Sequence, residues 1–344
     1  MPRGWLVAQL PRQNRSVTSV SDVPPPPQFE SREAFRAFKS DVEFWKPYID
    51  ITVADNGLTL RSGEVEAGFN STYPTFIAGD LVIKFLGHLN AWRQVYDAER
   101  TALERVAADP DIPGPELLGH GFLLGDLDTG WAWLATRRMP GQALWRLLPD
   151  RALHERIAIA LAEILPRIHA LPPQDIPEIA DWTAIDLTSA NRNSSLPEHL
   201  VEQVPDYVRT LGPPDPAFIN ADIVANHVYV EGGNLTGILD WGDAVITDRH
   251  VELIQIYRDT LRCDRALFRT FLEVSQWPVG PDFPRKALGY ALCRQGLRRI
   301  QNQGGGDVFE PIAEAYPLER IATLDELAEI LFDVWSPASD SGSQ

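Results

Sequence analysis

Short apolar runs separated by turn residues fill the first part of the chain, a pattern typical of β-strands. The clearest run is 80–86, where β-branched residues precede Gly87. Two helices are also predicted: a short one within 31–48, where aromatic residues recur at roughly helical spacing, and a second over 92–108, closed by Asp109-Pro110. The predicted strands are 58–60, 64–66, 76–77, 80–86, 116–122 and 131–139.

The pattern changes after Pro140-Gly141. Segment 153–170 is a long amphipathic stretch in which Pro166 predicts a kink or a division of the helix. The remaining predicted segments are strands at 217–220, 227–230 and 235–239 and helices from 249 to 335. Strands first and helices afterwards predict an α+β fold with two segregated lobes, rather than alternating βαβ units.

Both ends of the chain are predicted to lie outside these lobes. Residues 1–28 form a tail that ends near Pro24–Pro27, a stretch that suits neither a helix interior nor a central strand. This stretch either packs on the first lobe as a strap or stays loose, and the sequence favours neither. Residues 338–344 are predicted to form a frayed C-terminus.

Charge narrows the choice of partners. The 344 residues include 31 Lys and Arg against 48 Asp and Glu, a formal net charge of −17. Such a surface repels nucleic acid and anionic membrane, because both need a basic footprint. It would attract a cation, although an acidic surface can also serve solubility alone.

The two cysteines, Cys263 and Cys293, have no metal-type spacing and fit a reducing compartment. No secretory signal and no apolar run of membrane-spanning length is present, so a cytoplasmic protein is expected.

The most informative stretch carries carboxylates at the junctions of apolar segments. Asp222 follows the strand predicted at 217–220, and Asp240 ends the one predicted at 235–239. The segments on either side of Gly232-Gly233 can pair as a hairpin, which could bring both carboxylates into one cleft as a base and a metal ligand. The alternative is that each Asp caps a turn, the commonest role of Asp in loops.

Residues 218–230 and 237–243 resemble the catalytic and metal-binding loops of the aminoglycoside phosphotransferase family. The likeness rests on the order of an Asp-containing loop and an Ile-Leu-Asp-Trp-Gly-Asp segment, and on the separation of their aspartates. It implies a two-lobed, protein-kinase-like fold in which Asp222 is the base and Asp240 binds Mg²⁺. It further implies a nucleotide-binding lobe over 29–139 and a catalytic, substrate-binding lobe over 140–337.

Motifs in the first lobe match the same family in the same order. Lys84, in Val-Ile-Lys-Phe, resembles the lysine that grips the nucleotide phosphates, and Glu99 resembles its ion-pair partner. Alone, each would suit a solvated strand or helix face. By the same resemblance the remaining nucleotide contacts are Asn70, Ser71 and Thr72 in the loop 68–73 and Met139 at the interlobe hinge. The nucleotide is ATP or GTP, because hinge contacts from the backbone do not discriminate between them.

The chain departs from the family pattern at three positions. Asn220 replaces a loop-supporting His, and Ala221 replaces Gly. His227 occupies the position of the second metal ligand, usually Asn, and Asn226 lies one residue earlier. Because Mg²⁺ prefers oxygen ligands, either His227 or Asn226 could serve the metal, and His227 is favoured. An inactive, nucleotide-binding pseudokinase is the alternative.

Acidic residues near or after the metal loop are the candidates to bind a cationic acceptor beside the base. They are Asp222, Asp243, Glu252, Asp259 and Glu273. The segments that look most like hygromycin B phosphotransferases of actinomycete type are 82–87, 44–47 and 258–264, followed by 275–277. Hygromycin B or another aminoglycoside is therefore the expected acceptor. Metabolic acceptors, such as an amino sugar, choline or homoserine, remain open. Because Asp248 already starts the next helix, no activation segment follows Asp240, and peptide acceptors are not expected.

Overall fold

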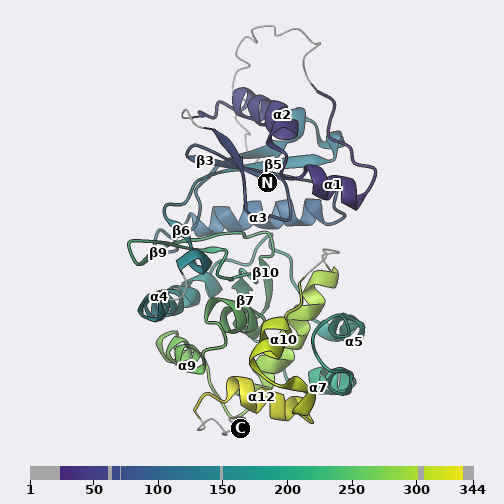
Figure 1. Cartoon of the computed structure of the whole chain (residues 1–344), viewed down its shortest axis with the longest axis vertical. Coiled ribbons are helices and arrows are strands. Elements are labelled where there is room, and N and C mark those ends of the chain that lie inside the picture. Colours follow the sequence, from purple (N-terminus) through teal and green to yellow (C-terminus); the bar gives the residue numbers. More distant parts are fainter. Residues whose placement is uncertain (1–23, 61–63, 70, 148–149, 301–305, 336–344) are drawn as a thin grey trace, which may run out of the picture.

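The computed structural model describes residues 24–60, 64–69, 71–147, 150–300 and 306–335. Its N-terminal region is an antiparallel five-stranded sheet in the order β1-β2-β3-β5-β4 (Figure 1). The strands are β1 Val65–Ala67, β2 Thr75–Ala78, β3 Leu81–Gly87, β4 Leu117–Phe122 and β5 Trp131–Arg137. The helices of this region are α1 Arg32–Phe38, α2 Val42–Asp55 and α3 Trp92–Val106.

The sheet separates two layers of helices, with α2 on one face and α3 on the other (Figure 1). Side chains alternate between these faces along each strand. On β3, Phe85 faces α2 and its ring stacks on Trp45, with centroids 5.0 Å apart. Leu86 packs instead with the α3 residues Val95 and Tyr96. Because Lys84 shares the parity of Leu86, the alternation directs Lys84 toward α3.

The C-terminal region is mainly helical and contains two small sheets. These are the three-stranded sheet β6-β8-β9 and the pair β10-β7. The strands are β6 Gln142–Ala143, β7 Pro216–Ile219, β8 Val228–Glu231, β9 Asn234–Ile238 and β10 Val245–Asp248. The α-helices are α4 Arg151–His169, α5 Leu187–Asn191, α6 Glu198–Val201, α7 Val204–Arg209, α8 Leu253–Gln255, α9 Arg265–Val274, α10 Phe283–Ile300, α11 Glu310–Ala315 and α12 Leu324–Phe332.

Shorter helical turns complete the fold. They are η1 Leu123–Gly125, η2 Leu127–Thr129, η3 Leu144–Leu147, η4 Trp182–Ala184, η5 Arg249–Glu252, the π-helical segment η6 Ile256–Thr260 and η7 Leu318–Arg320. Helix α10 runs through the middle of this region and contacts α5, α7, α8, α12 and η5 (Figure 1). One apolar core spans the region and also includes residues of α3, so α3 packs against both regions.

The α+β arrangement predicted from the sequence is confirmed, and β8 and β9 pair as the predicted hairpin. Some local predictions were wrong. Segment 31–48 contains parts of two helices, because Asp41 caps a new helix by accepting the N–H of Phe44. Residues 58–60 form no strand, and β10 was not predicted. Helix α4 continues through Pro166 rather than dividing there. The proposed lobe boundary between 139 and 140 falls between β5 and β6 and stays a prediction.

The proline stretch packs on the first region. The carbonyl of Pro25 accepts the Tyr48 hydroxyl at 2.8 Å, and that of Pro27 accepts the Trp131 indole N–H at 2.8 Å. The rest of the predicted tail, together with Asn70 and the predicted C-terminal fray, lies outside the described residues. Within the described residues, no helix combines the length and apolarity needed to cross a membrane.

Candidate active site

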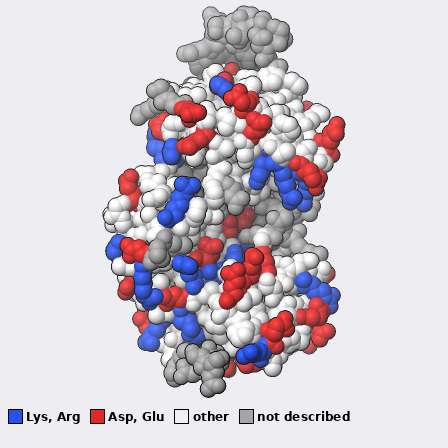
Figure 2. Space-filling model, viewed as in Figure 1, with Lys and Arg blue, Asp and Glu red and all other residues white. Residues whose placement is uncertain are grey.

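Three charged groups from distant parts of the chain meet between the two regions. The Nζ of Lys84 lies 2.8 Å from Glu99 Oε2 and 3.0 Å from Asp240 Oδ1. Glu99 reaches this point because it replaces an apolar residue in the buried stripe of α3. On the face shown in Figure 2, acidic side chains lie in the recess between the two regions. The structure thus brings together three of the residues selected from the sequence.

The charges in this cluster favour the ammonium form of Lys84 and the carboxylate form of Asp240. Burial alone would lower the pKa of Lys84, but the charges of Asp240 and Glu99 outweigh it and raise that pKa. Burial would raise the pKa of Asp240, whereas Lys84 and His227 hold it well below its usual range. Burial dominates at Glu99 and raises its pKa despite the contact with Lys84. The pKa of Lys84 is thus shifted in the direction that keeps its ammonium group charged.

The loop after Asp240 lies tightly against α3. A Cβ on Gly242 would lie 2.8 Å from Val95 Cγ1, so a larger residue would force the loop and the helix apart. Asp240 itself has a left-handed backbone, with φ of 53°. These constraints fix the position of the Asp240 carboxylate relative to Glu99 and Lys84.

Asp222 follows β7 and is held by two buried side chains. Its Oδ1 accepts hydrogen bonds from Gln255 Nε2 at 2.8 Å and from Arg294 Nη2 at 3.2 Å. Gln255 and Arg294 are both fully buried. The carboxylate of Asp222 is itself partly exposed, with 17% of its side chain accessible. The structure therefore presents a carboxylate with a fixed orientation at the edge of the recess.

His227 lies between the two aspartates. Its Nδ1 is 3.0 Å from the Asp222 carbonyl oxygen and 3.4 Å from Asp222 Oδ2, and its Nε2 is 3.7 Å from Asp240 Oδ2. Burial alone would lower the pKa of His227, but the carboxylates of Asp240 and Asp222 outweigh it and raise that pKa. An imidazole in this position links the loop that carries Asp222 to the loop that carries Asp240.

Of the three candidate metal ligands, Asp240, His227 and Asn226, only some suit Mg²⁺. A protein typically holds Mg²⁺ through one or two carboxylates, while waters and substrate phosphates complete the octahedron. Asp240 supplies a carboxylate in the recess, which fits. His227 faces the same carboxylate through Nε2, but only its neutral form could coordinate a metal. Asn226 is exposed, and no hydrogen bond within the described residues ties it to the loop.

Asn220 connects the two loops in place of the family's His. It is fully buried, its Nδ2 donates to the Asp240 carbonyl at 3.1 Å, and its Oδ1 accepts the N–H of Asp222 at 2.9 Å. Ala221 has φ of 65°, a left-handed backbone that suits the Gly of the family better than Ala. The strained backbone at Ala221 lies where the chain turns toward Asp222.

Glu252, a predicted acceptor contact, is engaged by other residues inside the protein. Glu252 is fully buried, and its Oε1 accepts the backbone N–H groups of Asn220 at 3.0 Å and Ala221 at 3.1 Å. Its Oε2 lies 3.1 Å from His169 Nε2. In the sequence Glu252 is one of several helix-face carboxylates, but tertiary packing turns it inward, where it supports the loop that leads to Asp222.

The same helical face holds other parts of that loop. Asp259 Oδ1 accepts the N–H of Ala225 at 2.6 Å, and the Thr260 hydroxyl donates to the Ile223 carbonyl at 3.1 Å. Asp259, a predicted acceptor contact, is thus engaged by the loop backbone. Asp259 and Thr260 belong to η6, whose π-helical geometry is frequent at functional sites.

The other predicted acceptor contacts lie apart from each other. Asp243 faces Arg294, with Oδ2 3.5 Å from Nη2, next to the metal loop. Glu273 lies on α9, is about half exposed, and pairs with Arg269 at 2.8 Å. Among the residues that the structure describes, Glu273 makes no hydrogen bond or ion pair with the recess. Asp243 therefore remains an acceptor candidate, whereas the structure does not bring Glu273 to Asp222.

The described part of the segment between β1 and β2 contacts the segment between α1 and α2. Lys39, between α1 and α2, donates from Nζ to the Ser71 carbonyl. Thr72 is exposed, and the Ser71 hydroxyl is buried with no hydrogen-bond partner among the described residues. Lys39 was not selected from the sequence, because its contact joins residues that are 32 positions apart in the chain.

The predicted hinge packs against β9. A Cβ on Gly237 would lie 3.1 Å from Met139 Cε, so the Met139 side chain lies directly over this strand. Gly141 has φ of 86°, and a Cβ there would be 2.3 Å from the Val230 carbonyl oxygen. Only Gly allows the chain to cross β8 this closely. Met139 is thus placed where the chain passes from one region to the other.

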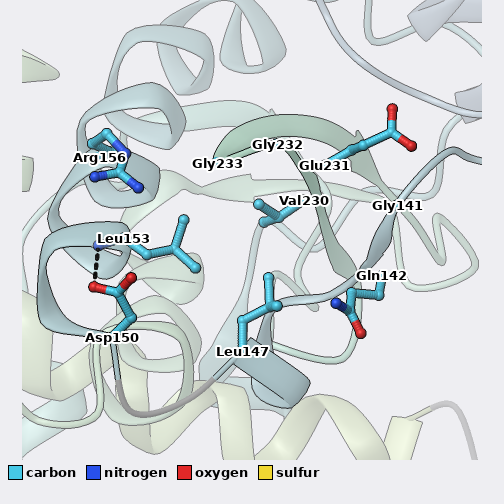
Figure 3. A pocket seen from close by; sticks show the side chains of 10 residues that line it. All are labelled: Gly141, Gln142, Leu147, Asp150, Leu153, Arg156, Val230, Glu231, Gly232 and Gly233. Atoms are coloured by element: carbon cyan, nitrogen blue, oxygen red, sulfur yellow. Dashed lines mark hydrogen bonds between the residues drawn. The ribbon is translucent and has the colours of Figure 1, made fainter.

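A separate cavity of about 660 Å³ opens between the start of α4 and the β8–β9 turn (Figure 3). Arg156, Glu231 and Asp150 contribute its charged groups. Asp150 also caps α4 by accepting the N–H of Leu153 at 3.0 Å. None of the candidate catalytic residues lines this cavity, so it is distinct from the recess described above.

Comparisons with known proteins agree with this geometry. The sequence matches the family profile described as the phosphotransferase enzyme family over residues 77–285, more than half of the chain. The chain therefore belongs to the phosphotransferase enzyme family and is a kinase-type transferase. The sequence resemblance to aminoglycoside phosphotransferases is confirmed at this level.

Solved structures with a similar fold include aminoglycoside phosphotransferases. The GDP complex of aminoglycoside 2'-phosphotransferase-IIIa is 19% identical, with a TM-score of 0.61, and the match covers 84% of this chain and 98% of that one. The complex of APH(2")-IIIa with GDP and kanamycin is 19% identical, with a TM-score of 0.57 and coverages of 84% and 98%. A thermostable APH(4)-Ia mutant with AMP-PNP and hygromycin B is 15% identical, with a TM-score of 0.50 and coverages of 83% and 98%. The predicted two-lobed kinase-like fold is confirmed.

Proposed function

We propose that the protein is a magnesium-dependent kinase that transfers the γ-phosphate of ATP or GTP to a hydroxyl of an aminoglycoside-type molecule. The observation that carries this proposal is the convergence of Lys84, Asp222 and Asp240 in one recess, with His227 between the two aspartates. If Asp222 and Asp240 only capped turns, there would be no reason for their carboxylates to lie in the same recess. Family membership supports phosphoryl transfer as the reaction class.

In this proposal the protein mainly positions and neutralises charge. Lys84, oriented by Glu99, binds phosphate oxygens of the nucleotide, and Met139 lies beside its base. Ser71 and Thr72, with Asn70, cover the phosphates from the β1–β2 loop. Asp222 aligns the acceptor hydroxyl and receives its proton as that oxygen attacks the γ-phosphorus and the bond to the leaving diphosphate breaks.

Asp240 would hold the magnesium ion, and His227 stands beside it. When bound, Mg²⁺ neutralises charge on the phosphate oxygens. The chain's own contribution is to fix the distance between Asp240 and Lys84 and to keep Asp240 ionised. His227 either completes the metal shell in its neutral form or donates a hydrogen bond to phosphate or to Asp240 in its protonated form.

Hygromycin B leads the acceptors that we propose. The net charge of −17 favours a cation, and Asp243 offers a carboxylate near Asp222 through their shared contact with Arg294. Two solved structures of the same fold contain kanamycin or hygromycin B, which places aminoglycosides first in any panel. An amino sugar, choline and homoserine represent metabolic acceptors in the same test.

The deciding experiment measures ADP and GDP release by the full chain with Mg²⁺ over this acceptor panel. Asp222→Asn should abolish acceptor-dependent turnover while it leaves nucleotide binding intact. Asp206→Asn, an exposed change on α7, is the matched control and should behave as the wild type. Turnover with a metabolite alone would replace the aminoglycoside, and nucleotide binding without turnover for any acceptor or metal would favour a pseudokinase.

A further inference from the structure

A buried arginine on α10 joins both loops of the candidate site. Arg294 is fully buried, and its Nε donates to the Ala221 carbonyl at 3.0 Å. Its Nη2 lies 3.2 Å from Asp222 Oδ1 and 3.5 Å from Asp243 Oδ2. One guanidinium thus contacts the backbone before the base, the base itself, and the loop that follows Asp240.

The buried surroundings of Arg294 require that its charge be compensated by specific partners. Its neighbours Cys293 and Leu297 are buried among the apolar residues of the C-terminal core. A buried guanidinium is costly unless carboxylates and hydrogen-bond acceptors compensate its lost hydration. Asp222 and Asp243 supply the carboxylates, and Ala221 supplies a carbonyl. Because the fork of Arg is planar, its contacts also fix the direction of the Asp222 carboxylate.

A second buried donor acts on the same oxygen. Gln255 Nε2 donates to Asp222 Oδ1 at 2.8 Å. The Gln255 Oε1 in turn accepts from Arg258 Nε at 2.6 Å, which fixes the orientation of the amide. Oδ1 of Asp222 is therefore the anchored oxygen, and Oδ2 is the one that faces His227 at 3.4 Å.

We propose that Arg294 is a positioning residue for phosphoryl transfer that aligns Asp222 and couples the base loop to the metal loop through Asp243. The proposal rests on the proposed function. Since Arg294 is fully buried, it acts through Asp222 and does not touch the acceptor. In this arrangement the carboxylate reaches the orientation needed to receive the hydroxyl proton only when both loops are in place.

Arg294→Gln should lower kcat by about 10- to 100-fold, the range expected when a charge-assisted hydrogen bond is lost. The KM of the acceptor and the Kd of the nucleotide should change by less than about threefold, because Arg294 contacts neither. Arg294→Lys keeps the charge without the fork and should restore part of the loss. This graded rescue separates positioning from a purely structural role.

Arg265→Gln is the matched control. Arg265 also lies on a helix and donates to backbone carbonyls of another segment, those of Ile330 and Asp333, but outside the recess. It should lower the melting temperature comparably and leave kcat within about twofold. Equal losses of kcat in Arg294→Gln and Arg265→Gln would overturn the proposal. An increase in acceptor KM at unchanged kcat would also overturn it, because it would show direct contact with the acceptor.

Hydrogen exchange provides a readout that does not require turnover. In Arg294→Gln, the amides of 220–225 should exchange at least several-fold faster than in the wild type and in Arg265→Gln, with nucleotide still bound. Faster exchange together with an inactive wild type would mean that the proposed function fails while the positioning contact stands. Unchanged exchange and unchanged kcat would mean that Arg294 does not position the loop.

Discussion

The ring of Phe69 stacks on the indole of Trp145, with centroids 5.1 Å apart and planes at 25°. Phe69 belongs to the loop between β1 and β2, whereas Trp145 lies in η3 and donates its N–H to the Ala225 carbonyl at 3.3 Å. The stack and this hydrogen bond together link the segment between β1 and β2 to the loop that carries Asp222. Phe69 remains 61% exposed, and its ring packs against Trp145 and under the guanidinium of Arg146, 5.7 Å from the ring centroid.

Removal of this stack should weaken nucleotide binding. An aromatic pair contributes about 0.5–1.5 kcal/mol, so Phe69→Ala should raise the nucleotide Kd by about 2- to 10-fold. Phe69→Tyr preserves the ring and is the control. Titration calorimetry measures both variants, and equal or tighter binding by Phe69→Ala would show that the stack obstructs the recess instead of closing it.

Lys84 both binds phosphate in our proposal and separates two carboxylates. Lys84→Met should lower kcat/KM by about 100-fold or more, as expected for loss of a charge-stabilising group. It should also destabilise the fold by about 1–2 kcal/mol, because Glu99 and Asp240 then face each other. The loss is moderated by solvent, since the Asp240 side chain is 40% exposed.

The double variant Lys84→Met/Glu99→Gln tests this reasoning. It removes one of the two negative charges and should recover most of the stability without recovering activity. Urea unfolding gives the free energies, and a turnover assay gives the activities. A double variant no more stable than Lys84→Met would contradict the proposed repulsion between Glu99 and Asp240.

Glu252 should affect the loop and not acceptor affinity. Glu252→Ala leaves the N–H groups of Asn220 and Ala221 without their acceptor and should lower the free energy of unfolding by about 2–4 kcal/mol. Glu252→Gln retains an acceptor oxygen and should lose less. Glu273→Gln, on an exposed face, should stay within about 0.5 kcal/mol of the wild type. A rise in acceptor KM as the main effect of Glu252→Gln would restore the acceptor-binding role.

The buried pair of Asp248 and His250 predicts acid sensitivity. Burial alone would raise the pKa of Asp248, but hydrogen bonds from the His250 imidazole and from backbone N–H groups lower it to about 2. Burial lowers the pKa of His250 below its usual 6.5. In acid the unfolded chain therefore takes up protons before the folded one, first at His250 and then at Asp248.

Stability should thus fall as pH decreases below about 6.5, and fall again between about 4 and about 2. Asp248→Asn should make the second decline shallower, because Asn does not titrate, while Asp240, whose pKa is also lowered, still contributes to it. Urea unfolding at each pH gives the free energies. The expectation is wrong if the slope between pH 4 and pH 2 is the same in Asp248→Asn and in the wild type.

Most of the fold and the principal cluster of the site could be predicted from the sequence. Local periodicity places Lys84 on a strand and Glu99 on a helix, but the family resemblance selected them, because each alone would equally suit a solvated position. The hairpin across Gly232-Gly233 follows from turn chemistry. The strand β10 escaped prediction because its four residues follow the metal loop directly and pair with β7, from which they are distant in sequence.

The sequence by itself determined the order of elements and the residues that carry charge into the recess, because periodicity and turn residues are local properties. Only the tertiary structure decided which carboxylates face the recess and which are buried against other residues. It turned Glu252 inward and set Arg294 against Asp222, 72 residues away. The burial of a charge depends on partners contributed by other elements, and those partners become neighbours only when the chain has folded.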